Sequence, residues 1–239
     1  MWPFYHRFQE DKMEDNRYSR QQLVPGFGPE AQKKLSQSRV LVVGAGGLGL
    51  PVLLALAGAG VGTLGVCDFD TVSLSNLHRQ TVFKTAEVGQ PKAELAAAYL
   101  RALNPEVRIQ VHASGLKPDE HLRDLLTDYE LIVDGSDNFE TRYLVNDSCA
   151  LLGLPLVFGA IFRDSGHAVL LHHPDAQGYA ANYRDLFPNL PAPGEVPNCA
   201  EAGVLGVLPG IIGNMMAAEA SRSLWEGHCI YTIRFVCFR

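Results

Sequence analysis

The amino-acid sequence predicts an α/β fold, in which helices cover both faces of a doubly wound, mostly parallel sheet. Short apolar runs rich in β-branched residues alternate with helical patterns along the chain, and this alternation is typical of parallel sheets. Residues 40–43 form the first such run, which ends at a glycine cluster, and an apolar helix is expected directly after it, over residues 50–57. A second strand is expected over residues 62–67, which an acidic segment follows.

The elements expected further along the chain continue this alternation and add antiparallel strands on the C-terminal side of the sheet. A long, proline-rich stretch over residues 174–203 interrupts the pattern. Helices are expected over residues 93–103, 118–126, 139–152 and 209–225, and strands over residues 107–111, 131–133, 155–160, 167–172 and 230–235, with the strand at 167–172 antiparallel.

Composition predicts one folded domain over residues 17–239, preceded by a flexible leader over residues 1–16. The chain has 239 residues, of which 47% are apolar and 19% charged, so it can bury a substantial core. Its net charge of −6 disfavours a nucleic-acid partner, and no membrane span or signal peptide is recognised, so a cytoplasmic protein is expected. Five widely spaced cysteines without a C-x-x-C pair indicate neither a disulfide framework nor a four-thiolate zinc site.

The glycine cluster predicts a phosphate-binding turn. Gly44, Gly46 and Gly49 match the G-x-G-x-x-G pattern between a strand and a helix, and Gly47 lies inside it. Glycines let the backbone approach phosphate oxygens, and the helix N-terminus supplies N–H groups and a partial positive charge. The motif by itself indicates a nucleotide in a Rossmann-like fold, and a tight turn without a ligand is the alternative.

Charged residues that follow the other strands narrow the choice of nucleotide. Asp68 ends the second strand 24 residues after Gly44, where such folds bind a ribose hydroxyl. Arg79 and Lys92 follow, and Asp137 comes after the fourth strand. Two cations and a further carboxylate around a phosphate cradle suit a triphosphate with Mg²⁺, for which Asp137 is the candidate ligand. Taken singly, each of these residues could equally be a surface charge or a helix cap.

An ordered series of motifs then resembles a known family. The chain resembles the ThiF/MoeB/HesA proteins, which are relatives of the ubiquitin-activating enzymes, over residues 17–225. The motifs that carry the resemblance are RYSRQ at 17–21, GAGGLG at 44–49, DFD at 68–70, SNLHRQ at 75–80, GQPK at 89–92 and DN at 137–138.

This resemblance implies ATP-dependent adenylation of the C-terminal glycine carboxylate of a ubiquitin-like sulfur-carrier protein, such as ThiS or MoaD, in thiamine or molybdopterin biosynthesis. It also implies roles for individual residues. Asp68 would hold the ribose, and Lys92 would contact the α-phosphate and the incoming carboxylate. The remaining residues that the resemblance assigns to ATP and Mg²⁺ are Gly44, Gly46, Gly47 and Gly49 in the cradle, Asn76 and Arg79 on the phosphates, Asn138 beside the nucleotide, and Asp137 on Mg²⁺.

The resemblance further implies partners. Arg20 matches an arginine that family members reach into the ATP site of a second subunit, so a homodimer is expected. Cys199 falls where some members carry a cysteine linked to sulfur transfer, and an inert loop cysteine is the alternative. Because no sulfurtransferase-like domain is recognised after the motifs, a separate sulfur-donor protein is expected.

One departure from the family concerns zinc. Many relatives hold zinc with two C-x-x-C pairs, whereas Tyr179 and Asn182 stand at the first pair here, and only Cys237 lies near the position of the second. No zinc site is therefore predicted, and residues 174–203 are expected to be poorly anchored.

Three alternatives stay open from the sequence. The first is an NAD-dependent oxidoreductase that uses the same glycine fingerprint, and it would be indifferent to substitution of Arg79 or Lys92. The second is a non-catalytic relative that binds a carrier protein. The third is an adenylating enzyme for another carboxylate.

Overall fold

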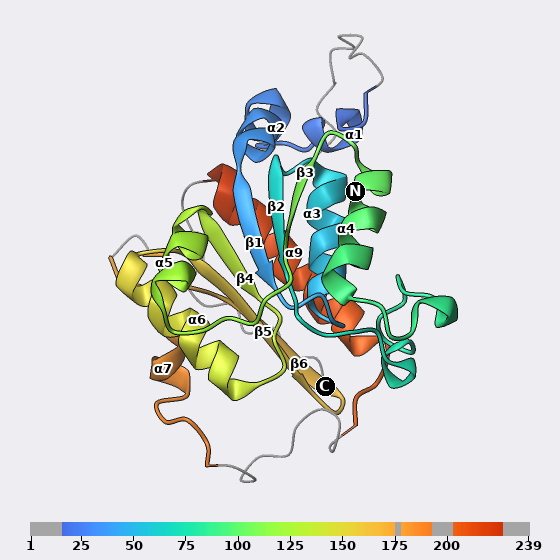
Figure 1. The fold of residues 1–239 in the computed structure, drawn as a ribbon. Helices are drawn as coiled ribbons and strands as arrows, with labels where there is room; N and C mark the ends of the chain where they lie inside the picture. The colour runs from blue at the N-terminus through green and yellow to red at the C-terminus, as the bar shows by residue number, and fades with distance from the viewer. Residues whose placement is uncertain (1–15, 175–177, 193–202, 227–239) are drawn as a thin grey trace, which may run out of the picture.

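The structure is a computed structural model that describes residues 16–174, 178–192 and 203–226 (Figure 1). The expected leader, apart from Asn16, and the expected last strand at 230–235 lie outside the described residues, as does Cys199. No helix within the described ranges is long and apolar enough to cross a membrane.

The described residues build a single sheet whose strands run in the order β3-β2-β1-β4-β5-β6. All neighbouring strands are parallel except β5 and β6, which form an antiparallel hairpin. The predicted fold class is therefore confirmed, including the added antiparallel strand on the C-terminal side. The strands are β1 (Arg39–Val43), β2 (Thr63–Cys67), β3 (Arg108–His112), β4 (Leu131–Asp134), β5 (Leu156–Phe162) and β6 (Ser165–Leu171).

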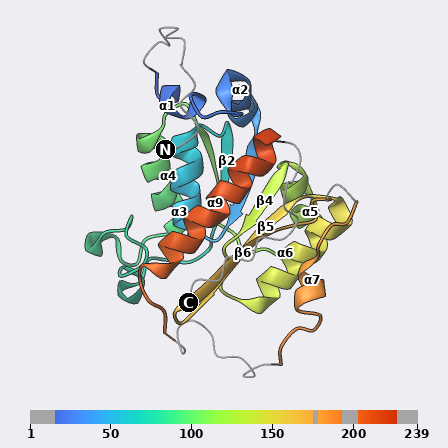
Figure 2. The ribbon, with the colours of Figure 1, turned by 180° about the vertical axis from the view of Figure 1, so that it is seen from behind.

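Helices cover both faces of this sheet (Figures 1 and 2). One face is covered by α3 (Gly49–Ala59), α4 (Lys92–Leu103) and the long α9 (Leu208–Glu226), which pack against one another and the strands. The opposite face is covered by α5 (Glu120–Thr127) and α6 (Phe139–Leu152), with α7 (Tyr183–Leu186) beside them. Two short helices, α1 (Ser19–Gln22) and α2 (Gly28–Gln37), precede β1, and the 3₁₀ turns η1 (Leu74–Asn76) and η2 (Thr85–Glu87) lie between β2 and α4.

The apolar run of β1 explains why this strand is central. Val40 and Val42 enter the core beneath α3 and α9, whereas Leu41 and Val43 enter the core beneath α5 and α6. Successive side chains of a strand point to opposite faces, so a strand that is covered on both sides has to be apolar throughout. Full burial of each such side chain stabilises the fold by about 1.5–3 kcal/mol.

Local capping fixes where the helices begin and end. Asn138 Oδ1 accepts a hydrogen bond from the Thr141 N–H at 2.8 Å, and α6 ends at Gly153, whose φ is +67°. The observed α6 therefore matches the predicted range. By contrast, α5 begins at Glu120, two residues later than predicted, because Asp119 caps it by accepting from the Leu122 N–H at 3.1 Å.

Residues 178–192 differ from the expected poorly anchored segment. The Tyr143 hydroxyl donates to the carbonyl oxygens of Phe187 at 2.8 Å and Asn189 at 2.7 Å, and Arg184 pairs with Asp147 at 2.6 Å. The expectation is therefore wrong for this part of the stretch, because polar side chains of α6 hold it in place.

Candidate nucleotide-binding site

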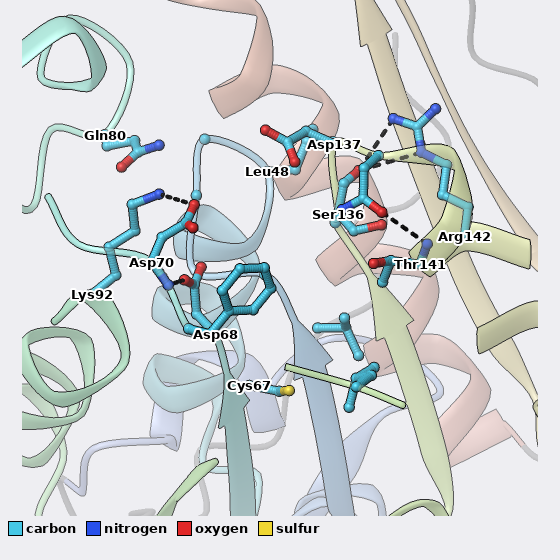
Figure 3. A pocket seen from close by; sticks show the side chains of 18 of the residues that line it. Leu48, Cys67, Asp68, Asp70, Gln80, Lys92, Ser136, Asp137, Thr141 and Arg142 are labelled. Carbon is cyan, nitrogen blue, oxygen red and sulfur yellow. Dashed lines mark hydrogen bonds and ion pairs between the residues drawn. The ribbon is translucent and has the colours of Figure 1, made fainter. Parts of the chain in front are cut away.

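A pocket opens at the carboxyl ends of the parallel strands β1, β2 and β4, between the glycine turn and the loops after β2 and β4 (Figure 3). Its empty volume is about 870 Å³, a figure that includes open solvent at its mouth. The lining residues are Val43, Gly44, Gly46, Gly47, Leu48, Cys67, Asp68, Phe69, Asp70, Arg79, Gln80, Lys92, Leu116, Gly135, Ser136, Asp137, Asn138, Thr141, Arg142 and Ile161.

The glycine turn needs its glycines for different reasons. Gly44 has a φ of +91°, and a Cβ on Gly49 would lie 1.7 Å from the carbonyl oxygen of Gly44. Gly44 and Gly49 therefore permit the turn itself. A Cβ on Gly47 would meet the ring of Pro209 at 3.0 Å, so Gly47 admits the first turn of α9. A Cβ on Gly46 would lie 3.4 Å from the Gln80 amide nitrogen, which leaves Gly46 the most tolerant of the four positions.

Asp68 fastens the second strand to the glycine turn. Its Oδ2 accepts from the Ala45 N–H at 2.7 Å, and its Oδ1 accepts from the Asp70 N–H at 2.8 Å. Burial raises the pKa of the Asp68 carboxyl group, although these two N–H donors act in the opposite direction. Each carboxylate oxygen still has a second lone pair, so Asp68 can also accept from a ribose hydroxyl.

Lys92 is the buried cation of the pocket. It is the first residue of α4 and is only 6% exposed, and its Nζ lies 2.9 Å from Asp70 Oδ2. Its backbone N–H also donates to the Asp70 carbonyl oxygen at 2.9 Å. Lys92 is thus held at the pocket wall by Asp70, a partner that the sequence analysis did not name.

Arg79 reaches the pocket from η1 and the turn after it. Its Nη1 donates to the Ser75 carbonyl oxygen at 3.0 Å, and its side chain lines the pocket. Asn76 does not line the pocket. Its carbonyl oxygen accepts from the N–H groups of Arg79 and Gln80 at 3.0 and 2.9 Å, so Asn76 shapes the turn that carries both residues.

The loop after β4 forms the other wall. Asp137 and Asn138 line the pocket there. Asp137 lies on the opposite side of the glycine turn from Lys92 (Figure 3). Asp137 is exposed to solvent. The side-chain oxygen of Asn138 caps the N-terminus of α6.

The structure adds pocket residues that sequence reasoning missed. Asp70 and Gln80 belong to motifs that were recognised, at 68–70 and 75–80, but received no role. Arg142 lies one helical turn after the N-cap Asn138, and this i, i+4 spacing was the available signal for it. Nothing in the sequence pattern indicated Ser136, because the hydrogen bonds by which it shapes the loop are made by its backbone.

Besides Asn76, one more predicted residue lies away from the pocket. Arg20 is exposed on α1, which lies at the amino end of β1, away from the pocket at its carboxyl end (Figure 1). One chain alone therefore does not bring Arg20 to this site. Cys199 lies outside the described residues.

The chain is similar in sequence to several named adenylyltransferases. The chain is 53% identical over 214 residues to the "Sulfur carrier protein adenylyltransferase" of Thermus thermophilus, covering 89% of this chain and 79% of that protein. It is 49% identical over 217 residues to the "SAMP-activating enzyme E1" of Haloferax volcanii, covering 90% and 78%. It is also 49% identical over 204 residues to the "Probable adenylyltransferase/sulfurtransferase MoeZ" of Mycobacterium tuberculosis, covering 85% of this chain and about half, 52%, of that longer protein.

Solved structures share the fold at lower identity. Escherichia coli MccB with ATP superposes with a TM-score of 0.72 at 21% identity, covering 92% of this chain and 67% of that one. PaaA superposes with a TM-score of 0.70 at 19% identity, covering 97% and 78%. The sequence pattern of the ThiF family matches residues 18–236, which is most of the sequence. Together with the high identity to the relatives above, this match shows that the chain belongs to the ThiF family.

Proposed function

We propose that the protein uses ATP to adenylate the C-terminal glycine carboxylate of a ubiquitin-like sulfur-carrier protein of the ThiS or MoaD type. The observation that carries the proposal is the meeting of Arg79, Lys92 and Asp137 around the glycine turn in one pocket. The printed names of the relatives support the reaction class, because several are called adenylyltransferases and one is a sulfur-carrier adenylyltransferase.

The chemistry explains why the pocket needs cations. An oxygen of the carrier's carboxylate attacks the α-phosphorus of ATP, and the bond from this phosphorus to the β-phosphate oxygen breaks, which releases pyrophosphate. The attacking group and its target are both negative, so the pocket has to neutralise charge as the transition state forms. In this proposal Lys92 would neutralise charge on the α-phosphate and the carboxylate, and Arg79 charge on the departing phosphates. The N-terminus of α3 at the glycine turn adds a partial positive charge.

Asp137 would hold Mg²⁺. When bound, this ion withdraws charge from phosphate oxygens as a Lewis acid. The residues fit the ion, because Mg²⁺ is commonly bound by one or two carboxylates together with substrate phosphates, and the Asp137 carboxylate is exposed at the pocket wall. The described ranges contain no cluster of three or more His, Cys, Asp or Glu side chains that could hold a metal without a substrate.

The finer parts of the proposal concern assembly and sulfur. The protein would act as a homodimer in which Arg20 of each subunit completes the other subunit's pocket. Residues 17–239 would form one catalytic domain, without zinc. A separate donor protein would deliver sulfur to the adenylated carrier, with Cys199 as the candidate for covalent participation.

ATP–pyrophosphate exchange tests the proposal. Labelled pyrophosphate is incubated with ATP, Mg²⁺ and candidate ThiS- or MoaD-like carriers, each with and without its terminal glycines. Exchange is expected only with an intact carrier, and it should fall by about 10²–10³-fold in Asp137→Asn. Asp124→Asn is the matched control, because Asp124 is an exposed carboxylate on α5 outside the pocket.

The outcomes separate the alternatives. Exchange that ignores every carrier and survives Asp137→Asn would refute the adenylation proposal. Carrier binding without exchange would identify a non-catalytic relative. Exchange stimulated by a different carboxylate would place the protein among adenylating enzymes for other substrates, and nicotinamide binding would favour the oxidoreductase.

A further inference from the structure

The backbone of Ser136 is held at both its N–H group and its carbonyl group, which belong to two successive peptide units. The Ser136 N–H donates to Asp134 Oδ1 at 2.9 Å. The Ser136 carbonyl oxygen accepts from Arg142 Nη2 at 3.1 Å and from Arg142 Nε at 3.4 Å (Figure 3). Asp134 is the last residue of β4 and Arg142 lies in the first turns of α6, so these bonds connect the two elements that flank the loop.

The rest of the loop is anchored as well. The Gly135 N–H donates to the Val43 carbonyl oxygen of β1 at 2.9 Å, and the Asn138 side chain caps α6. The loop therefore has a fixed backbone on both sides of Asp137. A carboxylate on such a backbone reaches a bound ion with little loss of conformational freedom, and this pre-organisation strengthens binding.

Arg142 is itself held in one position. Its guanidinium carbon lies 5.2 Å from the ring centre of Phe139 and 5.6 Å from that of Phe158. These cation–π contacts restrict the side chain while its Nε and Nη2 bind the Ser136 carbonyl oxygen. Arg142 is thus a rigid donor to the loop as well as a pocket-lining residue.

Asp134 is an unusual residue for its position. The three residues before it in β4 are apolar, and Asp134 itself is 0% exposed. A buried carboxylate is costly, and in this one Oδ1 accepts from the Ser136 N–H while the buried Oδ2 has no hydrogen-bond donor among the described residues. An apolar side chain could be buried at this position at a lower cost in free energy, so the carboxylate is best explained by what it does for the loop.

We infer that Asp134 and Arg142 are positioning residues that hold the N–H and the carbonyl oxygen of Ser136 and thereby aim Asp137 at the metal of a bound nucleotide. This inference rests on the proposed function, because it assigns Asp137 to Mg²⁺. Asp134 is fully buried and Arg142 is a cation, so neither would be a ligand of the ion. Both act through the backbone of the loop, as residues that orient metal ligands commonly do.

The test is the Mg²⁺ dependence of ATP binding to the full chain, measured by equilibrium titration at a series of free Mg²⁺ concentrations and in a chelator. Arg142→Gln and Asp134→Val are expected to raise the half-saturating Mg²⁺ concentration by about 10–100-fold, the usual effect of losing a residue that orients a metal ligand. ATP affinity in the chelator should stay at the wild-type value. Excess Mg²⁺ should restore tight binding.

Conservative variants keep the test decisive if Arg142→Gln or Asp134→Val fails to fold. Asp134→Asn retains an acceptor oxygen for the Ser136 N–H and should bind like the wild type. Arg142→Lys retains the charge but loses the planar fork, so its half-saturating Mg²⁺ concentration should lie between those of the wild type and Arg142→Gln. Arg123→Gln, an exposed arginine on α5 outside the pocket, is the matched control.

Two results would overturn the inference. Equal weakening of ATP binding with and without Mg²⁺ in Arg142→Gln would mean that Arg142 contacts the nucleotide itself. An unchanged Mg²⁺ dependence in all four variants would mean that the loop needs no such support. A wild-type protein that binds ATP with Mg²⁺ but exchanges no pyrophosphate would refute the proposed reaction while leaving this inference intact.

Discussion

Lys92 Nζ lies 2.9 Å from Asp70 Oδ2, and the two residues differ sharply in exposure. The Lys92 side chain is 7% exposed, whereas that of Asp70 is 54% exposed. The ammonium group is therefore buried in the pocket wall with an anion on its solvent side. A phosphate that enters the pocket would compete with Asp70 for this cation, so nucleotide binding and the stability of the empty protein are connected through this pair.

Asp70→Asn should destabilise the ligand-free protein and increase its response to ATP. Removing the carboxylate leaves a buried cation without its anion, at a cost of about 1–2 kcal/mol, between the values for exposed and buried pairs. ATP then supplies the missing negative charge, so its stabilising effect should exceed that on the wild type. Thermal unfolding of both proteins with and without ATP and Mg²⁺ measures this difference. An equal ATP-induced shift in both proteins would contradict it.

Alanine substitutions in the glycine turn should destabilise the fold in the order Gly49, Gly47, Gly46. The new Cβ would lie 1.7 Å from backbone at Gly49, 3.0 Å from Pro209 at Gly47 and 3.4 Å from the flexible Gln80 side chain at Gly46. Overpacking costs about 1–3 kcal/mol, which we expect for Gly47→Ala, with a larger loss for Gly49→Ala. Urea unfolding in the absence of nucleotide isolates this steric effect. Gly46→Ala proving as harmful as Gly49→Ala would show that the order is wrong.

Acidification should weaken the fold through partly buried histidines. Burial lowers the pKa of His112, His167 and His172, so the unfolded chain binds more protons than the folded one near and below the ordinary histidine pKa. Their contribution to stability is therefore present above about pH 6.5 and is lost as the pH falls below it. Each histidine that stays neutral in the folded state adds a slope of up to about 1.4 kcal/mol per pH unit.

Urea unfolding at pH 7.5 and 5.5 checks this slope. His172→Asn should reduce it, and asparagine suits the position because His172 has a φ of +57°. His121→Asn, at an exposed position on α5, is the control. If the His172 variant loses as much stability on acidification as the wild type, this histidine does not contribute to the pH dependence.

Tyr143→Phe should loosen residues 178–192 without unfolding the domain. The substitution removes the hydroxyl that donates to the carbonyl oxygens of Phe187 and Asn189, at a cost of about 1 kcal/mol. Limited proteolysis should then cut this segment faster than in the wild type. In the control Tyr99→Phe, which loses a hydroxyl on α4 instead, the protease should cut this segment at the wild-type rate. Unchanged cleavage of the Tyr143 variant would show that other contacts suffice to hold the segment.

Much of the candidate site could be predicted from the sequence because chain order and strand ends are local properties. Parallel strands bring their carboxyl ends to one edge, so Asp68 and Asp137, which follow different strands, had to approach the glycine turn. Lys92 was predictable for the same reason. The position of Asn76 was not predictable in this way. Asn76 ends a 3₁₀ turn, its carbonyl oxygen accepts from backbone N–H groups, and it is not among the residues that line the pocket.

The sequence by itself determined the alternation of strands and helices, the glycine turn and the family, since periodicity and short motifs encode these directly. Only the tertiary structure decided that Asp70 pairs with Lys92 and that Pro209 packs against Gly47. It also decided that Asp134 and Arg142 bind the N–H and the carbonyl oxygen of Ser136. The physical reason is that the first two contacts join segments distant in the chain, and all of them depend on side-chain directions set by packing. No periodicity records which carboxylate a buried lysine will meet.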